Sequence, residues 1–120
     1  MSADFWSFLD RLIVSSKVVV DRPRGSRHPR YPELVYPLDY GYLEGTTAGD
    51  GDGIDVWLGA SKKRAVTGVL LTVDLVKRDA EVKLTLGCTA EERLIALKFL
   101  KSQFMQAILI DRPTQSKEKK

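Results

Sequence analysis

Three aspartates stand close together in the stretch GDGDGIDVWLG, residues 49–59. Asp50 and Asp52 alternate with glycines, and Asp55 opens an apolar run that continues through Leu58. A solvated turn explains aspartates and glycines in general, since both are common turn residues and water screens their charges. It does not explain an acid at the start of an apolar strand, so close to two like charges. The spacing therefore favours a bound cation held through carboxylate oxygens.

The EF-hand, a calcium loop that also combines aspartates with a glycine, does not fit this stretch. It needs oxygen ligands at loop positions 1, 3 and 5, glycine at position 6 and glutamate at position 12. Counted from Asp50, positions 5, 6 and 12 are Ile54, Asp55 and Ser61. A different kind of cation site is therefore expected.

A second acidic pair lies further along the chain. Asp74 follows the apolar run GVLLTV, and Asp79 comes five residues later, after LVKR. This pattern is typical of a tight reversal between two strands, which would carry both acids to one end of a hairpin. The five carboxylates of the two motifs would suit Mg²⁺, which prefers oxygen ligands. Paired Mg²⁺ sites are common in phosphoryl transfer, because two ions can hold the attacking and the leaving oxygen.

Basic residues near these acids would suit the negative oxygens of a phosphorylated substrate. They lie in an arginine-rich segment, in the stretch after the acidic strand, and beside the hairpin. The candidates are Arg24, Arg27, Arg30, Lys62, Lys63, Arg64 and Lys83.

Hydrophobic periodicity predicts the elements that position these residues. Apolar residues at helical spacing indicate an N-terminal helix around 5–13 and a second helix over 89–107, which opens with the capping box of Thr89 and Glu92. β-Branched and alternating runs predict short strands at 40–45, 54–60, 65–76 and 80–89. The segment 21–37 holds all but one of the chain's five prolines and should be irregular.

These elements predict an α+β fold, a small and mostly antiparallel β-barrel of the OB-like kind with an N-terminal and a C-terminal helix. Residues 1–113 should form one domain, and the charged residues 114–120 a disordered tail. Strand alternation places Asp55 on the same face as Trp57, and it places Asp79, Glu81 and Lys83 on one face of their own strand.

Composition bounds the classes of partner. Hydrophobic residues make up 43% of the chain and charged residues 29%, and no run approaches the roughly 18 apolar residues of a membrane helix. Without the terminal Lys117, Glu118, Lys119 and Lys120, 16 basic residues face 15 acidic ones. A nucleic-acid-binding barrel, suggested by the pI of 9.1, therefore ranks last, because the acids would repel a phosphate backbone. One cysteine and no basic leader favour the cytoplasm, and a homo-oligomer stays possible.

Two stretches carry a resemblance to a known family. The first is YPLDYGYLEGTTAGDGDGIDVWLG, residues 36–59, and the second is GVLLTVDLVKRDAEVKL, residues 68–84. Both resemble the signature regions of the soluble family I inorganic pyrophosphatases, in the same order and at the same spacing. The similarity covers about residues 18–87, and the chain would be a short, divergent member. The resemblance implies Mg²⁺-dependent hydrolysis of pyrophosphate or a related phosphoanhydride, with Mn²⁺ as a possible alternative metal.

The resemblance also implies roles for single residues. Asp52 matches the acid that helps to activate the attacking water, Tyr40 a tyrosine that lines the site, and Arg30 a phosphate-binding lysine. Lys98 matches the lysine of a Tyr-Lys pair that reads here as Leu97-Lys98. The metal ligands would be Asp50, Asp55, Asp74, Asp79 and, more loosely, Asp21, which matches a glutamate that holds a metal through water.

The sequence departs from the family at the positions that grip phosphate. Glu81 stands where the family has a lysine, and Lys83, one step along the same strand face, is the local replacement. An arginine that the family keeps before its Tyr-Pro motif has no counterpart at that spacing. These departures leave an alternative open, a non-catalytic relative that binds a divalent cation or phosphate.

Overall fold

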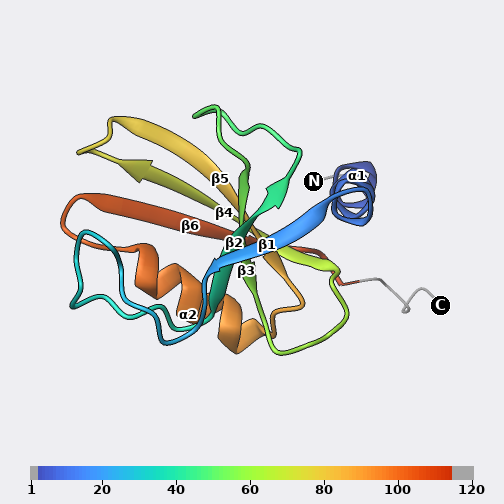
Figure 1. The fold of residues 1–120 in the computed structure, drawn as a ribbon. Coiled ribbons are helices and arrows are strands. Elements are labelled where there is room, and N and C mark those ends of the chain that lie inside the picture. Colours follow the sequence, from blue (N-terminus) through green and yellow to red (C-terminus); the bar gives the residue numbers. More distant parts are fainter. Residues whose placement is uncertain (1–2, 115–120) are drawn as a thin grey trace.

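This computed structural model describes residues 3–114, which contain two helices and six strands (Figure 1). Helix α1 and helix α2 lie near the two ends of the chain, with five strands between them. In chain order the elements are α1 (Ala3–Val14), β1 (Lys17–Arg22), β2 (Asp39–Glu44), β3 (Ile54–Leu58), β4 (Val66–Asp74), β5 (Asp79–Leu86), α2 (Ala90–Leu100) and β6 (Met105–Asp111).

The strands form one sheet in the order β1-β2-β3-β5-β4-β6. Every neighbouring pair is antiparallel except β3 and β5, which run parallel. This confirms the α+β class and the mostly antiparallel, OB-like sheet. The expected barrel is not closed, because β1 and β6 form opposite edges of the sheet and are not paired with each other.

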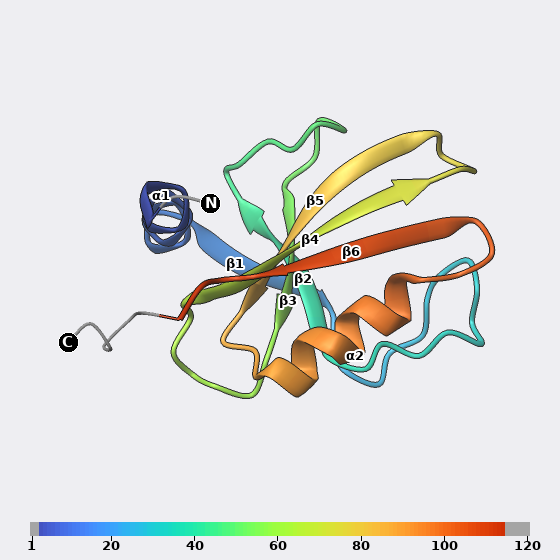
Figure 2. The same cartoon turned by 180° about the vertical axis from the view of Figure 1, so that it is seen from behind.

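Strand alternation gives the sheet two apolar faces, each covered by a helix. Val56 and Leu84 belong to the cluster that packs against α1 through Trp6 and Ile13. The opposite face carries Trp57 and Leu70, which pack with Ala96 and Leu100 of α2. Figure 2 shows α2 lying along β6 on this second side. Asp55 and Lys83 lie on the α2 side of their strands, since Asp55 alternates with Val56 and Lys83 with Leu84.

The second helix is shorter than the periodicity predicts, and a strand follows it. Helix α2 ends at Leu100, so the expectation that Phe104 and Met105 lie on this helix is wrong. Lys101 is extended, and the Ser102 hydroxyl accepts hydrogen bonds from the backbone N–H groups of Phe104 and Met105, which closes a turn. The residues after it pair with β4 as strand β6. Pairing with β4 outweighs the helical spacing of the apolar residues in this segment.

The proline-rich segment between β1 and β2 is irregular, as predicted. Strand β1 extends two residues further than the valine run, with a bulge between Val20 and Arg22. Backbone hydrogen bonds between Ser26 and Tyr36 and between His28 and Leu34 then hold the segment against itself. It returns the chain to β2 close to α2 (Figure 1).

No helix within residues 3–114 has the length and apolar character needed to cross a bilayer. The predicted tail, 114–120, lies outside the described residues except for Thr114.

Candidate active site

The β4–β5 hairpin carries the second acidic pair, as predicted. Asp74 and Asp79 are cross-strand partners that flank its turn. Asp74 also shapes the turn, since its Oδ1 accepts hydrogen bonds from the N–H groups of Val76 and Lys77 at 2.9 and 3.0 Å. The Asp79 carboxylate lies 3.7 Å from the Lys77 ammonium. The hairpin therefore brings both acids to one end of the sheet.

The loop between β2 and β3 presents Asp50 and Asp52 to solvent. Asp50 Oδ1 accepts a hydrogen bond from the Asp52 N–H at 3.0 Å, and this bond holds the pKa of Asp50 below its usual value. The Asp52 carbonyl accepts from the Ala48 N–H at 2.7 Å. Gly51 has φ +90°, a conformation that suits glycine. The loop thus exposes two carboxylates, and a hydrogen bond within the loop holds that of Asp50.

Asp55 and Lys83 meet because β3 and β5 pair in parallel with these two residues in register. The Lys83 ammonium donates to Asp55 Oδ2 at 2.8 Å, to the Tyr40 hydroxyl at 2.9 Å and to Glu81 Oε1 at 3.1 Å. Lys83 is 6% exposed. Burial alone would lower its pKa, but Tyr40 and Asp55 raise it above the usual lysine value. Lys83 is therefore a charged group held inside the site.

Glu81 lies between the buried Lys83 and two outer acids, Asp50 and Asp79. Its side chain is 9% exposed, and it bonds Lys83 through one oxygen while Oε2 is buried without a hydrogen-bond partner. The Lys77 ammonium lies 3.7 Å from Oε2. Asp50 and Asp79 lie close enough to interact with the Glu81 carboxyl. Burial raises the pKa of Glu81, and the Lys83 charge offsets part of the rise.

Aromatic rings form the floor beside Lys83. Tyr40 packs on Trp57 and Tyr36 with ring centroids 4.6 and 5.5 Å apart, and Phe99 of α2 packs on Tyr36 at 4.9 Å. Burial raises the pKa of Tyr40, so its phenol stays protonated and accepts the Lys83 hydrogen bond with its oxygen. The rings keep water away from one side of the ammonium.

Arg22 is a further candidate for the site, which sequence reasoning missed. It lies opposite Tyr40 in the β1–β2 register, and its Nη1 donates to the Tyr36 hydroxyl at 2.6 Å. The guanidinium carbon lies 5.6 Å from the centre of the Tyr36 ring. Only the strand register could have revealed it, because the β1 bulge breaks simple alternation at this position.

Three other predicted residues lie apart from the carboxylates. Asp21 is exposed on edge strand β1, two strands from β3. Arg30 is in the proline-rich segment, where its N–H donates to His28 Nδ1 at 3.1 Å. Lys98 is exposed in the last turn of α2. None of the contacts described for these three residues joins them to Asp55 or Glu81, so their roles stay predictions.

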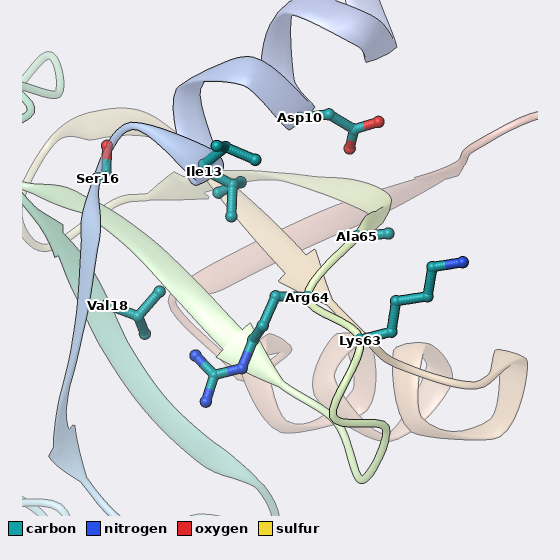
Figure 3. A pocket seen from close by; sticks show the side chains of 8 residues that line it. Asp10, Ile13, Ser16, Val18, Lys63, Arg64 and Ala65 are labelled. Atoms are coloured by element: carbon teal, nitrogen blue, oxygen red, sulfur yellow. The ribbon is translucent and has the colours of Figure 1, made fainter.

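The side chains of residues 3–114 do not bring three carboxylate, imidazole or thiol groups into an arrangement that could hold a metal ion as it stands. A hollow of about 700 Å³ opens beside Glu81, with Thr72, Lys101 and Ala107 among its walls. A second hollow of about 560 Å³ lies by α1, lined by Ile13, Val18 and Arg64 (Figure 3). Asp10 is the one acid among its lining residues, so none of the candidate-site acids belongs to it, and Lys63 and Arg64 extend in opposite directions.

Solved structures define the class of fold. An inorganic pyrophosphatase from Neisseria gonorrhoeae matches with a TM-score of 0.59 and 18% identity, over 78% of this chain and 80% of that one. The inorganic pyrophosphatase of Helicobacter pylori matches with 0.56 and 16%, over 80% and 82%. A protein described as an inorganic phosphatase from Anaplasma phagocytophilum matches with 0.55 and 15%, over 78% and 81%. At these identities the likeness concerns the fold alone.

The family model for inorganic pyrophosphatase matches residues 14–102, which include both acidic motifs, Lys83 and most of the sheet. The chain therefore belongs to the inorganic pyrophosphatase family, and its enzyme class is that of the inorganic diphosphatase hydrolases. No curated protein sequence matches the chain.

Proposed function

We infer that this protein hydrolyses inorganic pyrophosphate, or a related phosphoanhydride, to phosphate with the help of a divalent cation. The family match over residues 14–102 supports this proposal, since it spans both acidic motifs. The observation that carries it furthest is the gathering of Asp50, Asp79 and Glu81 at one end of the sheet, with the buried Glu81 Oε2 left without a hydrogen bond.

We place the divalent cation at an outer group of acids, Asp50, Asp79 and Glu81, and not at Asp55, although these carboxylates would have to move closer together to bind it. Glu81 Oε2 is a buried carboxylate oxygen without a hydrogen-bond donor, and the Asp50 carboxylate is exposed and close enough to interact with Glu81. Asp55, in contrast, already binds the Lys83 ammonium through Oδ2. We therefore assign the cation to Asp50, Asp79 and Glu81, with Asp74 beside them. A Mg²⁺ ion bound there would polarise the phosphate oxygens.

Asp52 is assigned to proton transfer. It is adjacent to Asp50 on the exposed loop, and its backbone rather than its carboxylate makes the hydrogen bonds that hold the loop. The carboxylate is therefore available to accept a proton from the attacking water. Arg22, half-buried against Tyr36, is the candidate cation for a phosphate oxygen, since only one of its N–H groups is used in that hydrogen bond.

The test is phosphate release from pyrophosphate by purified protein, with Mg²⁺ and with chelator. Asp52→Asn should lower kcat by about 10²-fold or more, the usual range for general acid–base groups, while circular dichroism stays unchanged. Asp4→Asn, in the exposed first turn of α1, is the matched control and should keep full activity. Mg²⁺-dependent release that Asp52→Asn does not affect would refute the assignment of Asp52.

A non-catalytic relative that binds a divalent cation or phosphate is the second candidate. The observation in its favour is that Lys83 uses its three N–H donors on protein groups, so this lysine offers none to a phosphate. The same assay separates the two. A protein whose melting temperature rises with Mg²⁺ but which releases no phosphate would be such a relative.

A further inference from the structure

The Lys83 ammonium lies where carboxylates of two strands converge. Asp55 reaches it from β3, and Glu81 reaches it from two residues earlier on β5. The Tyr40 hydroxyl of β2 is the third partner. An ammonium has three donors, and here each has an acceptor at 2.8 to 3.1 Å. All three N–H donors of Lys83 are therefore used by acceptors on β2, β3 and β5.

The backbone fixes this arrangement. Asp55 and Lys83 are paired residues of the parallel β3–β5 ladder, so their side chains leave the sheet side by side on the same face. Trp57 follows on that face, is fully buried and packs against Tyr40. The side chain of Lys83 has therefore little freedom to swing its charge elsewhere, and withdrawing the charge would leave two carboxylates facing each other in a poorly solvated place.

A divalent ion that bridged Asp55 Oδ2 and Glu81 would have to occupy this same space. Mg²⁺ binds oxygen at about 2.0–2.1 Å, much closer than an ammonium does, and its charge would repel that of Lys83. Its entry would require Lys83 to give up all three of its hydrogen bonds. The ammonium and a metal ion are therefore mutually exclusive at Asp55 Oδ2, the oxygen that faces Glu81, whereas the outer oxygen of Glu81 makes no hydrogen bond with Lys83.

We propose that Lys83 is a built-in cation that neutralises Asp55 and Glu81 in place of a divalent metal ion, so that the chain binds one metal ion fewer than its carboxylates would otherwise hold. The inference rests on the proposed function only for the existence of metal-binding acids in the outer group. Lys83 is a positioning residue in this role, since it holds Asp55 and Glu81 and leaves the substrate to other groups.

The test counts bound Mn²⁺ per chain by electron paramagnetic resonance, without pyrophosphate. Lys83→Met keeps the length of the side chain and removes the charge, and it should bind one Mn²⁺ more than the wild type. Adding Asp55→Asn to Lys83→Met should remove that extra ion. Lys77→Met is the matched control, because it removes an exposed positive charge beside the same acids and should add no ion.

Asp55→Asn in the wild-type background is the second arm, and it decides alone if Lys83→Met does not fold. The proposal expects Asp55→Asn to bind as many Mn²⁺ ions as the wild type. The loss of an ion in that variant, or no gain in a folded Lys83→Met, would overturn it. Phosphate release plays no part in this count, so an inactive protein would refute the proposed function without affecting the result for Lys83.

Discussion

At the scale of single residues, the charge balance around Glu81 decides how the site works. Considered from sequence, Glu81 puts a negative charge where a cation would meet a phosphate oxygen, and its replacement by lysine should raise kcat/KM. The structure changes that expectation, because one Glu81 oxygen is bonded to Lys83 and the side chain is nearly buried. Glu81 therefore stabilises the buried positive charge of Lys83.

Glu81→Lys should therefore destabilise the protein. It would place two ammonium groups side by side and remove a partner from the buried Lys83, and breaking a buried ion pair in this way costs about 3–5 kcal/mol. The free energy of unfolding from urea titration at pH 7 measures the loss. Glu33→Lys, at an exposed position of the proline-rich segment, is the control and should change it by less than about 0.5 kcal/mol. A Glu81→Lys protein of wild-type stability would contradict the pairing.

Cys88 predicts a second residue-scale effect, on stability at alkaline pH. Burial raises the pKa of its thiol to about 12, with a further rise from Glu92. An unfolded cysteine ionises near pH 8.5, so the unfolded state loses its proton first, and the free energy of unfolding should fall as pH rises above that value. Cys88→Ala should remove this slope between about pH 8 and 9.5, below the range in which unfolded tyrosine and lysine titrate. An unchanged slope in the variant would assign it to another group.

At the scale of elements, hydrogen bonds to the side chain of one glutamate, Glu92, join the N-terminus of α2 to the segment after β3. Glu92 completes the capping box by accepting from the Thr89 N–H at 2.9 Å, and it also accepts from the Ala60 N–H at 3.1 Å. The Thr89 hydroxyl in turn accepts from the Glu92 N–H. The cap thus ties the helix to the segment that follows β3.

Thr89→Ala should lower the free energy of unfolding by about 1 kcal/mol, the usual effect of removing a helix N-cap. Glu92→Ala should cost more, because it leaves both the Thr89 and the Ala60 N–H groups without their acceptor. Thermal unfolding followed by circular dichroism measures both changes. If the two variants have the same melting temperature, the hydrogen bond from the Ala60 N–H to Glu92 contributes nothing to stability.

The elements also show what a sequence can reveal of this fold. The capping box of Thr89, the alternation that puts Leu84 and Glu81 on opposite faces of β5, and the hairpin between Asp74 and Asp79 are local patterns, and the structure confirms them. Strand β6 depends on pairing with β4, a distant partner, so the periodicity alone assigns its first residues, 105–107, to the preceding helix. The open sheet follows from that pairing as well, because β6 occupies the free edge of β4.

The candidate site, like the fold, has some features that the sequence predicts and others that it does not. Short-range motifs predict that the acids lie at one end of the sheet, and the hairpin and the loop do carry them there. The bonds of Lys83 with Asp55 and Tyr40 depend on the β3–β5 register, and the place of Arg22 depends on a bulge in β1. Neither can be read from spacing, because each joins residues of separate strands.

At the scale of the whole molecule, one contact joins the first helix to the end of the last strand. Arg112 Nη1 lies 2.9 Å from Asp10 Oδ2 and also donates to the Val66 carbonyl, while the Val66 N–H donates to Asp10 Oδ1. The Arg112 guanidinium also lies over the Trp6 ring, 5.9 Å from its centre. The group holds α1, β4 and the end of β6 together.

Arg112→Ala should lower the free energy of unfolding by about 1 kcal/mol, since the ion pair is partly open to solvent and therefore screened. Asp10→Ala should cost slightly more, because it also leaves the Val66 N–H without its acceptor. The double variant should lose less than the sum of the two, by about 0.5 kcal/mol or more. Urea titrations of the three variants, with Asp4→Ala as the control on α1, measure this coupling, and strict additivity would show that the two side chains act separately.

The contact between Asp10 and Arg112 also bears on the order in which the chain folds. Its partners are 102 positions apart, and closing so long a loop before the residues between them are ordered carries a larger entropic cost than closing the β4–β5 hairpin. The hairpin should therefore form early and this contact last. Interactions that form after the transition state act on the rate of unfolding, so Arg112→Ala should speed unfolding in stopped-flow measurements and leave the refolding rate nearly unchanged.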